Sequence, residues 1–199
     1  EVRAVDLADP TAREVFCQEL AGRNISILCA NAGTATFGPL AKLDPAGEKA
    51  QVQLNAIAVH DLCLAVLPGM LERGWGRIVN VASTAGLKGY PYVAAYCAAK
   101  HGVIGLTRAL ALEVAGQGVT VNAVCPGYTE TEIVHDSIAR VVAKTGRTPA
   151  QAMAEFVKGN PQGRLVQPGE VADAVLWLCG EGASAITGQS IAVAGGEVM

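Results

Sequence analysis

Apolar runs of strand length alternate with longer stretches of helical periodicity along most of the chain. The apolar runs are bounded by Gly, Pro, Asn or Asp, and they predict strands at 2–6, 25–30, 77–82, 119–125 and 190–194. Amphipathic periodicity predicts helices at 11–22, 46–73, 93–115 and 168–179. Asp9 before Pro10 is a helix start signal, and Gly74 and Gly116 are stop signals after the second and third helices. Strands separated by helices form parallel sheets, so the pattern predicts an α/β fold with a doubly wound, Rossmann-like parallel sheet.

The region 128–167 breaks this alternation. It carries short helical patterns that are interrupted by glycine or proline at positions 146, 149, 159, 161 and 163. A segment of this kind between regular elements is typical of a mobile cover over a pocket, so we interpret it as a lid. The chain has no internal repeat or linker, and we expect residues 1–199 to form a single domain.

Length and composition exclude several classes of protein. The 199 residues, 51% of them hydrophobic, are enough to bury a core and are not typical of a disordered chain. The net charge is −3 and the charges are scattered, so no nucleic-acid partner is predicted. The apolar stretches are interrupted and no secretory signal opens the chain, so we expect neither a membrane span nor secretion.

The cysteines and histidines suggest no disulfide and no metal site. The six cysteines contain no CxxC pair, and the three histidines lack the spacing of metal ligands. Several cysteines lie in apolar runs, which is typical of reduced, buried thiols. We therefore expect a cytoplasmic protein without a bound metal.

The most informative motif is the pair Tyr96 and Lys100, which follows Ser83 at a short distance. Four residues apart on a helix, the phenol and the ammonium share one face. A nearby positive charge favours the phenolate, so we expect Lys100 to lower the pKa of Tyr96 and make it a proton donor or acceptor. Ser83 follows a predicted buried strand, at the strand end where ligands bind in open α/β sheets, and its hydroxyl would polarise a substrate oxygen.

Further motifs stand at the ends of the predicted strands and in the second helix: Asn31-Ala32-Gly33, Asn55, Pro126-Gly127 and Thr131. In this order, together with Ser83, Tyr96 and Lys100, they resemble the short-chain dehydrogenase/reductase family, and the resemblance covers the whole chain. It implies an NAD(P)-dependent oxidoreductase that interconverts a ketone and a secondary alcohol by hydride transfer.

The resemblance also implies a role for each residue. The implied catalytic set is Asn55, Ser83, Tyr96 and Lys100. In it, Tyr96 transfers the proton, Ser83 holds the substrate oxygen, and Lys100 also binds the nicotinamide ribose. Asn55 would hold a water that joins Lys100 to solvent, although the residues alone also allow a core amide that kinks the helix.

The cofactor contacts implied by the same resemblance are Asp6, Leu7, Asn31, Ala32, Gly33, Tyr96, Lys100, Pro126, Gly127, Thr129 and Thr131. Asp6 and Leu7 would lie near the adenine, and the stretch from Asn31 would pass under the adenosine ribose. A solvated strand end at Asp6 and a plain strand-exit turn at Asn31 remain alternatives.

The N-terminal part departs from the family pattern. Family members begin with a strand, a Gly-rich turn that binds the pyrophosphate, and a second strand whose end selects NAD or NADP. The chain opens instead on residues 2–6, which resemble the third strand, so we expect the natural protein to be longer and leave NAD and NADP both open. In the family order the two missing strands lie beside the fourth strand, so the strand at 25–30 is predicted to have an open edge.

The segments expected to contact substrate have less specific sequence motifs than the catalytic residues: Thr84–Val93, Thr34–Gly38, Tyr128 and the lid. Residues Asn160–Arg164 and the ending Gly188–Gly196 resemble the branch of 3-oxoacyl-thioester reductases, acting on acyl carrier protein or CoA thioesters, and 3-hydroxyacyl-CoA dehydrogenases, including polyketide ketoreductases. Alternatives are a dehydrogenase of another small or cyclic alcohol, an isomerising relative, and a non-catalytic protein with a dinucleotide fold. The family usually assembles through the helices 46–73 and 93–115, which implies a homotetramer.

Overall fold

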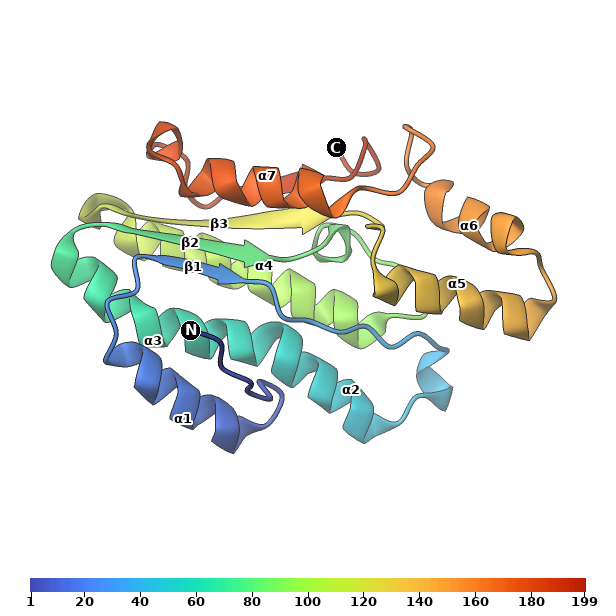
Figure 1. Cartoon of the computed structure of the whole chain (residues 1–199), viewed down its shortest axis with the longest axis horizontal. Coiled ribbons are helices and arrows are strands. Elements are labelled where there is room, and N and C mark those ends of the chain that lie inside the picture. Colours follow the sequence, from blue (N-terminus) through green and yellow to red (C-terminus); the bar gives the residue numbers. More distant parts are fainter.

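The computed structural model describes residues 1–199 and shows a central parallel sheet with helices on both faces (Figure 1). The strands, in their order across the sheet, are β1 (Ile27–Ala30), β2 (Gly76–Val81), β3 (Val119–Pro126) and β4 (Ser190–Val193). The helices are α1 (Pro10–Ala21), α2 (Pro45–Val52), α3 (Ala58–Arg73), α4 (Ala94–Val114), α5 (Glu132–Thr145), α6 (Pro149–Val157) and α7 (Pro168–Cys179). A π-helical turn, η2 (Gln53–Ile57), joins α2 to α3, and short 3₁₀ turns are η1 (Leu40–Lys42), η3 (Thr84–Gly86), η4 (Ala115–Gln117) and η5 (Glu181–Ala183). The predicted α/β, Rossmann-like fold is confirmed.

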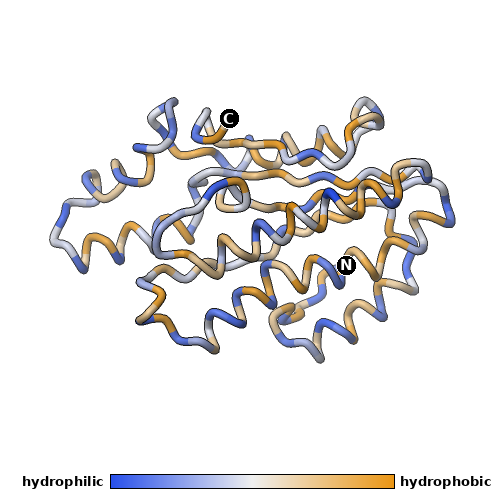
Figure 2. Tube along the Cα trace, turned by 180° about the vertical axis from the view of Figure 1, so that it is seen from behind, coloured by the Kyte–Doolittle hydropathy of each residue, from blue (hydrophilic) through white to orange (hydrophobic).

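Side chains of the two central strands alternate between two cores. Ile78 on β2 and Val121 on β3 point to one face of the sheet and pack with α3 and α4. Val79 on β2 and Val124 on β3 point to the other face and pack with α7. Successive residues of a strand point to opposite faces, so a strand covered on both sides needs apolar residues at nearly every position. The central strands follow this rule except at the buried polar residues Arg77, Asn80, Thr120 and Asn122, and Figure 2 accordingly shows orange stretches interrupted by paler and blue ones.

The continuous helical stretch Pro45–Arg73 has a mean hydropathy of 1.6 and is, by length and composition alone, able to cross a membrane. In the fold, Val59, Cys63 and Val66 of this stretch lie in the main core against β2 and α4. The stretch is therefore accounted for as a core helix of the α/β layers. It ends at Gly74 in the left-handed conformation, as predicted.

Residues 2–6 do not form the predicted strand. A strand needs a hydrogen-bonded neighbour, and no strand of the sheet pairs with this segment. The following helix, α1, begins after the N-cap Asp9 as predicted and docks on α3 rather than on the sheet. Arg13, only 4% exposed, makes this contact: its Nε donates to Asp61 at 2.8 Å and its Nη1 donates to the Leu7 carbonyl at 2.7 Å.

The predicted open edge of the strand at 25–30 is confirmed, because β1 pairs only with β2. Ile27 on this strand is 46% exposed, and Cys29 is exposed as well. The expectation of buried thiols is therefore wrong for Cys29 and holds fully only for Cys63 and Cys125. All six cysteines are unpaired.

Residues 128–167 are more regular than their sequence suggests. They form α5 and α6, which pack on each other around a small core of their own that contains Val134, Ile138, Ala152 and Leu165. Figure 1 shows this pair (yellow-brown to orange) projecting beyond the carboxyl ends of the strands. The pair therefore stands beside the sheet rather than over one of its faces.

The α-helix predicted at 93–115 ends at Val114, close to the predicted position, but the turn residue is not Gly116, because the chain continues through η4 and turns at Gly118 with φ 75°. A Cβ at Gly118 would lie 2.0 Å from the Gly74 carbonyl oxygen, whereas a Cβ at Gly116 would meet no atom within 4 Å. Two adjacent helix ends thus meet at a point where only glycine fits.

We predict that Gly118→Ala lowers the free energy of unfolding by about 1–3 kcal/mol, because it adds left-handed strain and a backbone clash. Gly116→Ala is the matched control and is expected to leave the free energy unchanged or to raise it by up to about 1 kcal/mol. Urea unfolding of both variants provides the measurement. Equal effects of the two substitutions would contradict the assignment of Gly118 as the turn residue.

Candidate active site

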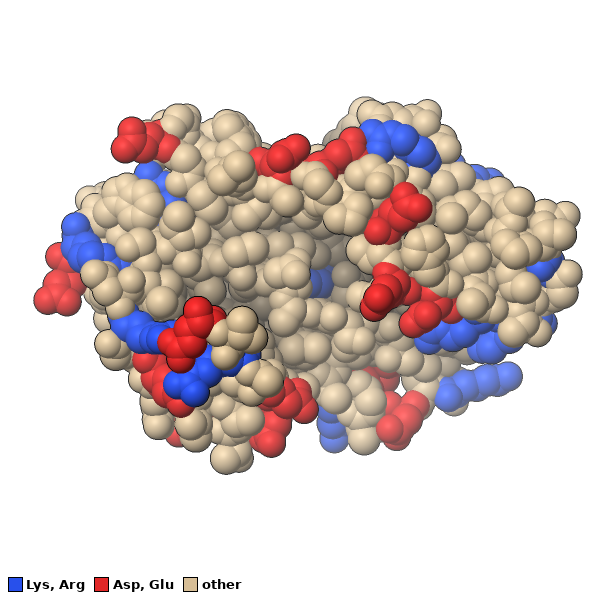
Figure 3. Space-filling view, viewed as in Figure 1, with Lys and Arg blue, Asp and Glu red and all other residues tan.

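A cavity of about 200 Å³ opens at the carboxyl ends of β1, β2 and β3, where Figure 3 shows a hollow in the surface. Ligands of open α/β sheets bind at this edge. The cavity is lined by nine of the predicted site residues: Asn31, Gly33, Ser83, Tyr96, Lys100, Pro126, Gly127, Thr129 and Thr131. Asp6, Leu7, Ala32 and Asn55 do not line it. Residues far apart in the sequence are thus gathered at one end of the sheet.

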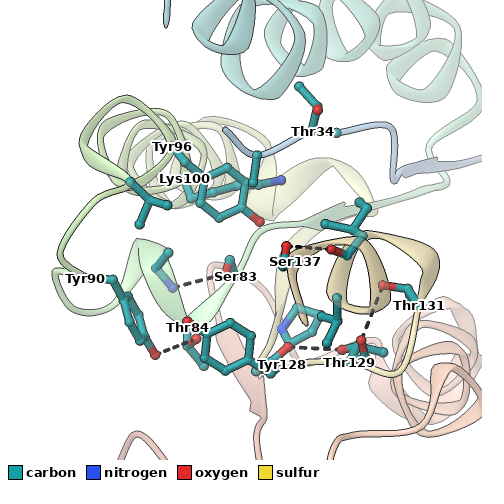
Figure 4. A pocket seen from close by; sticks show the side chains of 18 of the residues that line it. Thr34, Ser83, Thr84, Tyr90, Tyr96, Lys100, Tyr128, Thr129, Thr131 and Ser137 are labelled. Atoms are coloured by element: carbon teal, nitrogen blue, oxygen red, sulfur yellow. Dashed lines mark hydrogen bonds between the residues drawn. The ribbon is translucent and has the colours of Figure 1, made fainter. Parts of the chain in front are cut away.

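Ser83 stands at the exit of β2 and caps the turn η3. Its backbone is extended, and its Oγ accepts a hydrogen bond from the Ala85 N–H at 3.1 Å. A hydroxyl has one proton to donate and two acceptor positions, so this bond leaves the proton available to the Tyr96 oxygen or to a ligand oxygen in the cavity. Figure 4 shows Ser83 between Tyr96 and the residues of η3.

Lys100 is 3% exposed and extends from α4 beneath the cavity. Its Nζ donates to the Val81 carbonyl at 2.8 Å and lies 5.6 Å from the centre of the Tyr96 ring. Burial lowers the pKa of Lys100 to about 8. An ammonium can donate three hydrogen bonds, and this contact uses one of them.

The expectation that Lys100 lowers the pKa of Tyr96 is wrong for this structure. Burial raises the pKa of Tyr96, and the Ser83 hydroxyl offsets only part of that rise. The reason is geometric, because the ammonium is directed at the Val81 carbonyl instead of the phenol oxygen. A protonated phenol is the form that can give a proton to a ketone oxygen, so the raised pKa suits the reductive direction.

Asn55 is fully buried in the π-helical turn η2. Its Nδ2 donates to the carbonyls of Thr34 and Gln51 at 2.8 and 2.9 Å, and its Oδ1 accepts from the Thr34 N–H at 3.2 Å. A Cβ on Gly33 would lie 2.7 Å from the same Oδ1. The amide therefore ties the loop after β1 to the helix, and single π turns are frequent at functional sites.

The far side of the cavity is built from Tyr128, which was expected at the substrate, and from two aromatic residues that the sequence did not point to individually, Tyr90 and Phe156. Tyr90 follows η3, Tyr128 follows β3, and Phe156 lies on α6. The ring centres of Tyr90 and Tyr128 are 6.3 Å apart and those of Tyr128 and Phe156 are 5.1 Å apart, both edge to face. Ser137 of α5 also faces the cavity (Figure 4). The sequence predicted which segments lie near substrate, but it has no pattern that shows which aromatic side chains within them line the cavity.

Comparison with known proteins gives the family. A family model described as enoyl-(acyl carrier protein) reductase matches residues 1–197. A proposed ketoacyl reductase of Streptomyces coelicolor is 42% identical over 174 residues, which cover 86% of this chain and 67% of that protein. A D-beta-hydroxybutyrate dehydrogenase of Rhizobium meliloti is 44% identical over 146 residues, which cover 73% of this chain and 57% of that protein.

The solved structures agree with the sequence matches. A crystal structure of a variant actinorhodin polyketide ketoreductase with NADPH has a TM-score of 0.90 at 39% identity, covering 98% of this chain and 76% of that chain. The chain belongs to the short-chain dehydrogenase/reductase family. It spans 57–76% of the length of these family members.

The family membership supports dependence on NAD or NADP without a preference between them. A proposed NAD(P)-dependent gluconate 5-dehydrogenase from Beutenbergia cavernae, 37% identical with a TM-score of 0.87, was solved with NADP. The residues of this chain fit the nicotinamide and ribose part of such a cofactor. The backbone at Gly33 is exposed and too close to Asn55 to carry a side chain, and the buried Lys100 ammonium keeps donors free beside it.

We predict that Lys100 loses its proton near pH 8 in the cofactor-free protein. Its folded pKa lies below the unfolded value of 10.5, so the unfolded state binds more protons between these two pH values. The stability of the wild type relative to Lys100→Met should therefore rise with pH through that window. The measurements are an NMR titration of the Lys100 side chain and urea unfolding at several pH values; a Lys100 signal that does not move between pH 7 and 9 would contradict the assignment.

Proposed function

We propose that the protein catalyses hydride transfer between NAD(P) and a ketone or secondary alcohol in the cytoplasm, with a 3-oxoacyl thioester as substrate. One observation carries the proposal: Ser83, Tyr96 and Lys100 line the same cavity as Pro126, Gly127, Thr129 and Thr131. A ketone needs a proton donor and a hydrogen-bond donor at its oxygen and a hydride donor at its carbon. A nicotinamide held beside Lys100 would supply the hydride. The unpaired cysteines support a reducing compartment.

Each residue has a proposed part in this reaction. Tyr96 gives its proton to the substrate oxygen, and Ser83 donates a hydrogen bond to the same oxygen. Lys100 holds the nicotinamide ribose with the hydrogens that its contact with the Val81 carbonyl leaves free. Asn55 keeps the loop at Gly33 and Thr34 in place. We also propose that it holds a water that joins Lys100 to solvent.

The cavity favours a neutral substrate over a free carboxylic acid. Among its lining residues Lys100 is the only cation, and its ammonium lies beneath Tyr96 and Val81. Acidic side chains stand on the rim near α5 (Figure 3), where Glu130 and Glu132 are exposed. A substrate carboxylate would therefore remain unpaired in an apolar cavity, which is costly. A thioester places an uncharged acyl group there and leaves its carrier outside, and the pair α5–α6 is proposed as the lid over it.

The relatives support the same substrate class. Proteins from Streptomyces coelicolor, Streptomyces virginiae and Streptomyces violaceoruber carry ketoacyl reductase in their names, at 35–42% identity. The name of the Rhizobium meliloti relative specifies a hydroxy acid instead, so the free acid is the alternative that an experiment has to test.

We predict that Tyr96→Phe lowers the rate of ketone reduction by about a hundredfold to ten-thousandfold, since only the transferable proton is removed. The complete natural protein is assayed with acetoacetyl thioester and NADH or NADPH, and cofactor binding is measured separately by fluorescence. Ser83→Ala should lower the rate in the same way through lost carbonyl polarisation.

Tyr92→Phe serves as the control, because Tyr92 is exposed and does not line the cavity. It should leave the rate unchanged. Free acetoacetate should be reduced much less efficiently than the thioester. Wild-type rates in Tyr96→Phe would rule out the mechanism, and a preference for free acetoacetate would rule out the substrate class.

We also propose a homotetramer assembled through α3 and α4. The outer side of α4 carries Ala98, Gly102 and Gly105, spaced on one face, and a Cβ on either glycine would meet nothing within 4 Å. Leu64 on α3 and Leu112 on α4 are exposed as well. Small residues on one helix face let a second helix approach closely.

We predict that light scattering gives four times the chain mass and that Gly102→Arg dissociates the assembly, because it blocks this close approach. Gln18→Arg, a change on the exposed side of α1, is the control and should not alter the mass. A wild-type protein that stays monomeric at micromolar concentration contradicts the proposal.

A further inference from the structure

A buried carboxylate stands behind the aromatic side of the cavity and takes no part in the proposed reaction. It belongs to Glu197, near the C-terminus, whose side chain is only 4% exposed. The Tyr90 hydroxyl donates to Glu197 Oε1 at 2.5 Å, and Lys88 Nζ lies 3.3 Å from the same oxygen. Burying a carboxylate is costly unless it is paired and hydrogen-bonded, and these two contacts meet that requirement.

The surrounding backbone leaves room for this carboxylate. A Cβ on Gly127 would lie 3.0 Å from Glu197 Oε2, and one on Gly159 would lie 3.2 Å from Oε1. Gly127 follows β3, and Gly159 follows α6. Any side chain at these positions would crowd the carboxylate. The carboxylate therefore touches the turn after η3, the exit of β3 and the end of α6.

The contact with Tyr90 is continued across the cavity by the aromatic rings. Tyr90 packs edge to face on Tyr128, and Tyr128 packs edge to face on Phe156 of α6. The Tyr90 oxygen also lies 2.8 Å from Thr84 Oγ1, whose hydroxyl can donate to it. Figure 4 shows Tyr90, Thr84 and Tyr128 on the opposite side of the cavity from Tyr96 and Lys100. The wall that Glu197 supports is thus separate from the proton-transfer residues.

We propose that Glu197 is a positioning residue for substrate: its carboxylate holds Tyr90, and through Tyr90 the wall formed by Tyr90, Tyr128 and Phe156, in the place that receives the acyl group. The proposal rests on the proposed ketone reduction and assigns substrate affinity to the C-terminal segment. Rings that are held in place require little ordering when substrate binds, so their support acts on binding rather than on proton transfer.

The first experiment measures KM and kcat in the complete natural protein with acetoacetyl thioester. Glu197→Ala and Tyr90→Phe should each raise KM roughly tenfold, because a hydrogen bond to a charged group is lost, and leave kcat within about threefold. Glu197→Gln keeps an acceptor oxygen and should restore much of the affinity. Since both single changes break the same hydrogen bond between Tyr90 and Glu197, the KM of the double variant should be no higher than that of either single variant.

Two further variants test the geometry. Gly159→Ala should raise KM by crowding the carboxylate from the outside, although it removes no interaction. Glu155→Gln is the matched control, because this exposed carboxylate on α6 adjoins Phe156 and pairs only with exposed Arg147. Its KM should equal that of the wild type. Independent, additive effects of Glu197→Ala and Tyr90→Phe, or a loss of kcat without a change of KM, would overturn the proposal.

A second readout does not depend on activity. With tyrosines labelled at the ring carbon that bears the hydroxyl, the NMR signals of Tyr90 and Tyr128 should shift in Glu197→Gln and stay in place in Glu155→Gln. Unmoved Tyr90 and Tyr128 signals would overturn the positioning role even in an active enzyme. If the wild type reduces no ketone and the signals do shift, the proposed function fails while the contact between Glu197 and the aromatic wall stands.

Discussion

The site depends on how closely the turn after β2 packs against helix α4. A Cβ on Gly86 would lie 2.7 Å from the Lys100 carbonyl oxygen and 2.8 Å from Ile104 Cδ1, so the turn η3 rests directly on the helix backbone. This approach brings Ser83, which caps η3, into the same cavity as Tyr96 and Lys100. A glycine at the contact lets a turn and a helix meet without an intervening side chain. The chain between Ser83 and Tyr96 thus has the length needed to leave β2, form the turn η3 against α4 and begin α4.

The polar groups at the site are held by backbone atoms at the ends of strands. Lys100 is anchored on the Val81 carbonyl at the end of β2, and Asn55 is anchored on both backbone groups of Thr34 after β1. Strand ends of a parallel sheet are rigid because their residues are paired on the sheet side and packed on both faces. Desolvation of Lys100 is therefore imposed by the fold rather than by a neighbouring charge, and its direction, a lowered pKa, follows from burial alone.

Much of the fold could be predicted because buried strands and capped helices have local codes. Asp9 and Gly74 marked helix ends correctly, and the mainly apolar runs marked β2 and β3. The failures share a cause, namely that the deciding partner is distant in the sequence. Residues 2–6 lack a neighbouring strand, Gly118 turns against Gly74, and the Lys100 ammonium is drawn to a carbonyl of β2. The hydrogen bond between Tyr90 and Glu197 was not predicted for the same reason, because the sequence around either residue gives no sign of the other.

The two sides of the cavity have different physical origins. The side proposed to carry the reaction consists of strand ends and α4, and the large core fixes it, with Val103 and Ile104 packed against the sheet. The side proposed to receive substrate rests on the small separate core of α5 and α6 and on the buried carboxylate of Glu197. A core of few residues can change without loss of the main fold, because stability resides in the larger one. The relatives differ in the substrates that their names specify, a ketoacyl group in one case and hydroxybutyrate in another. The substrate side, built on Tyr90, Tyr128 and Phe156, is then where differences in specificity within the family should be sought.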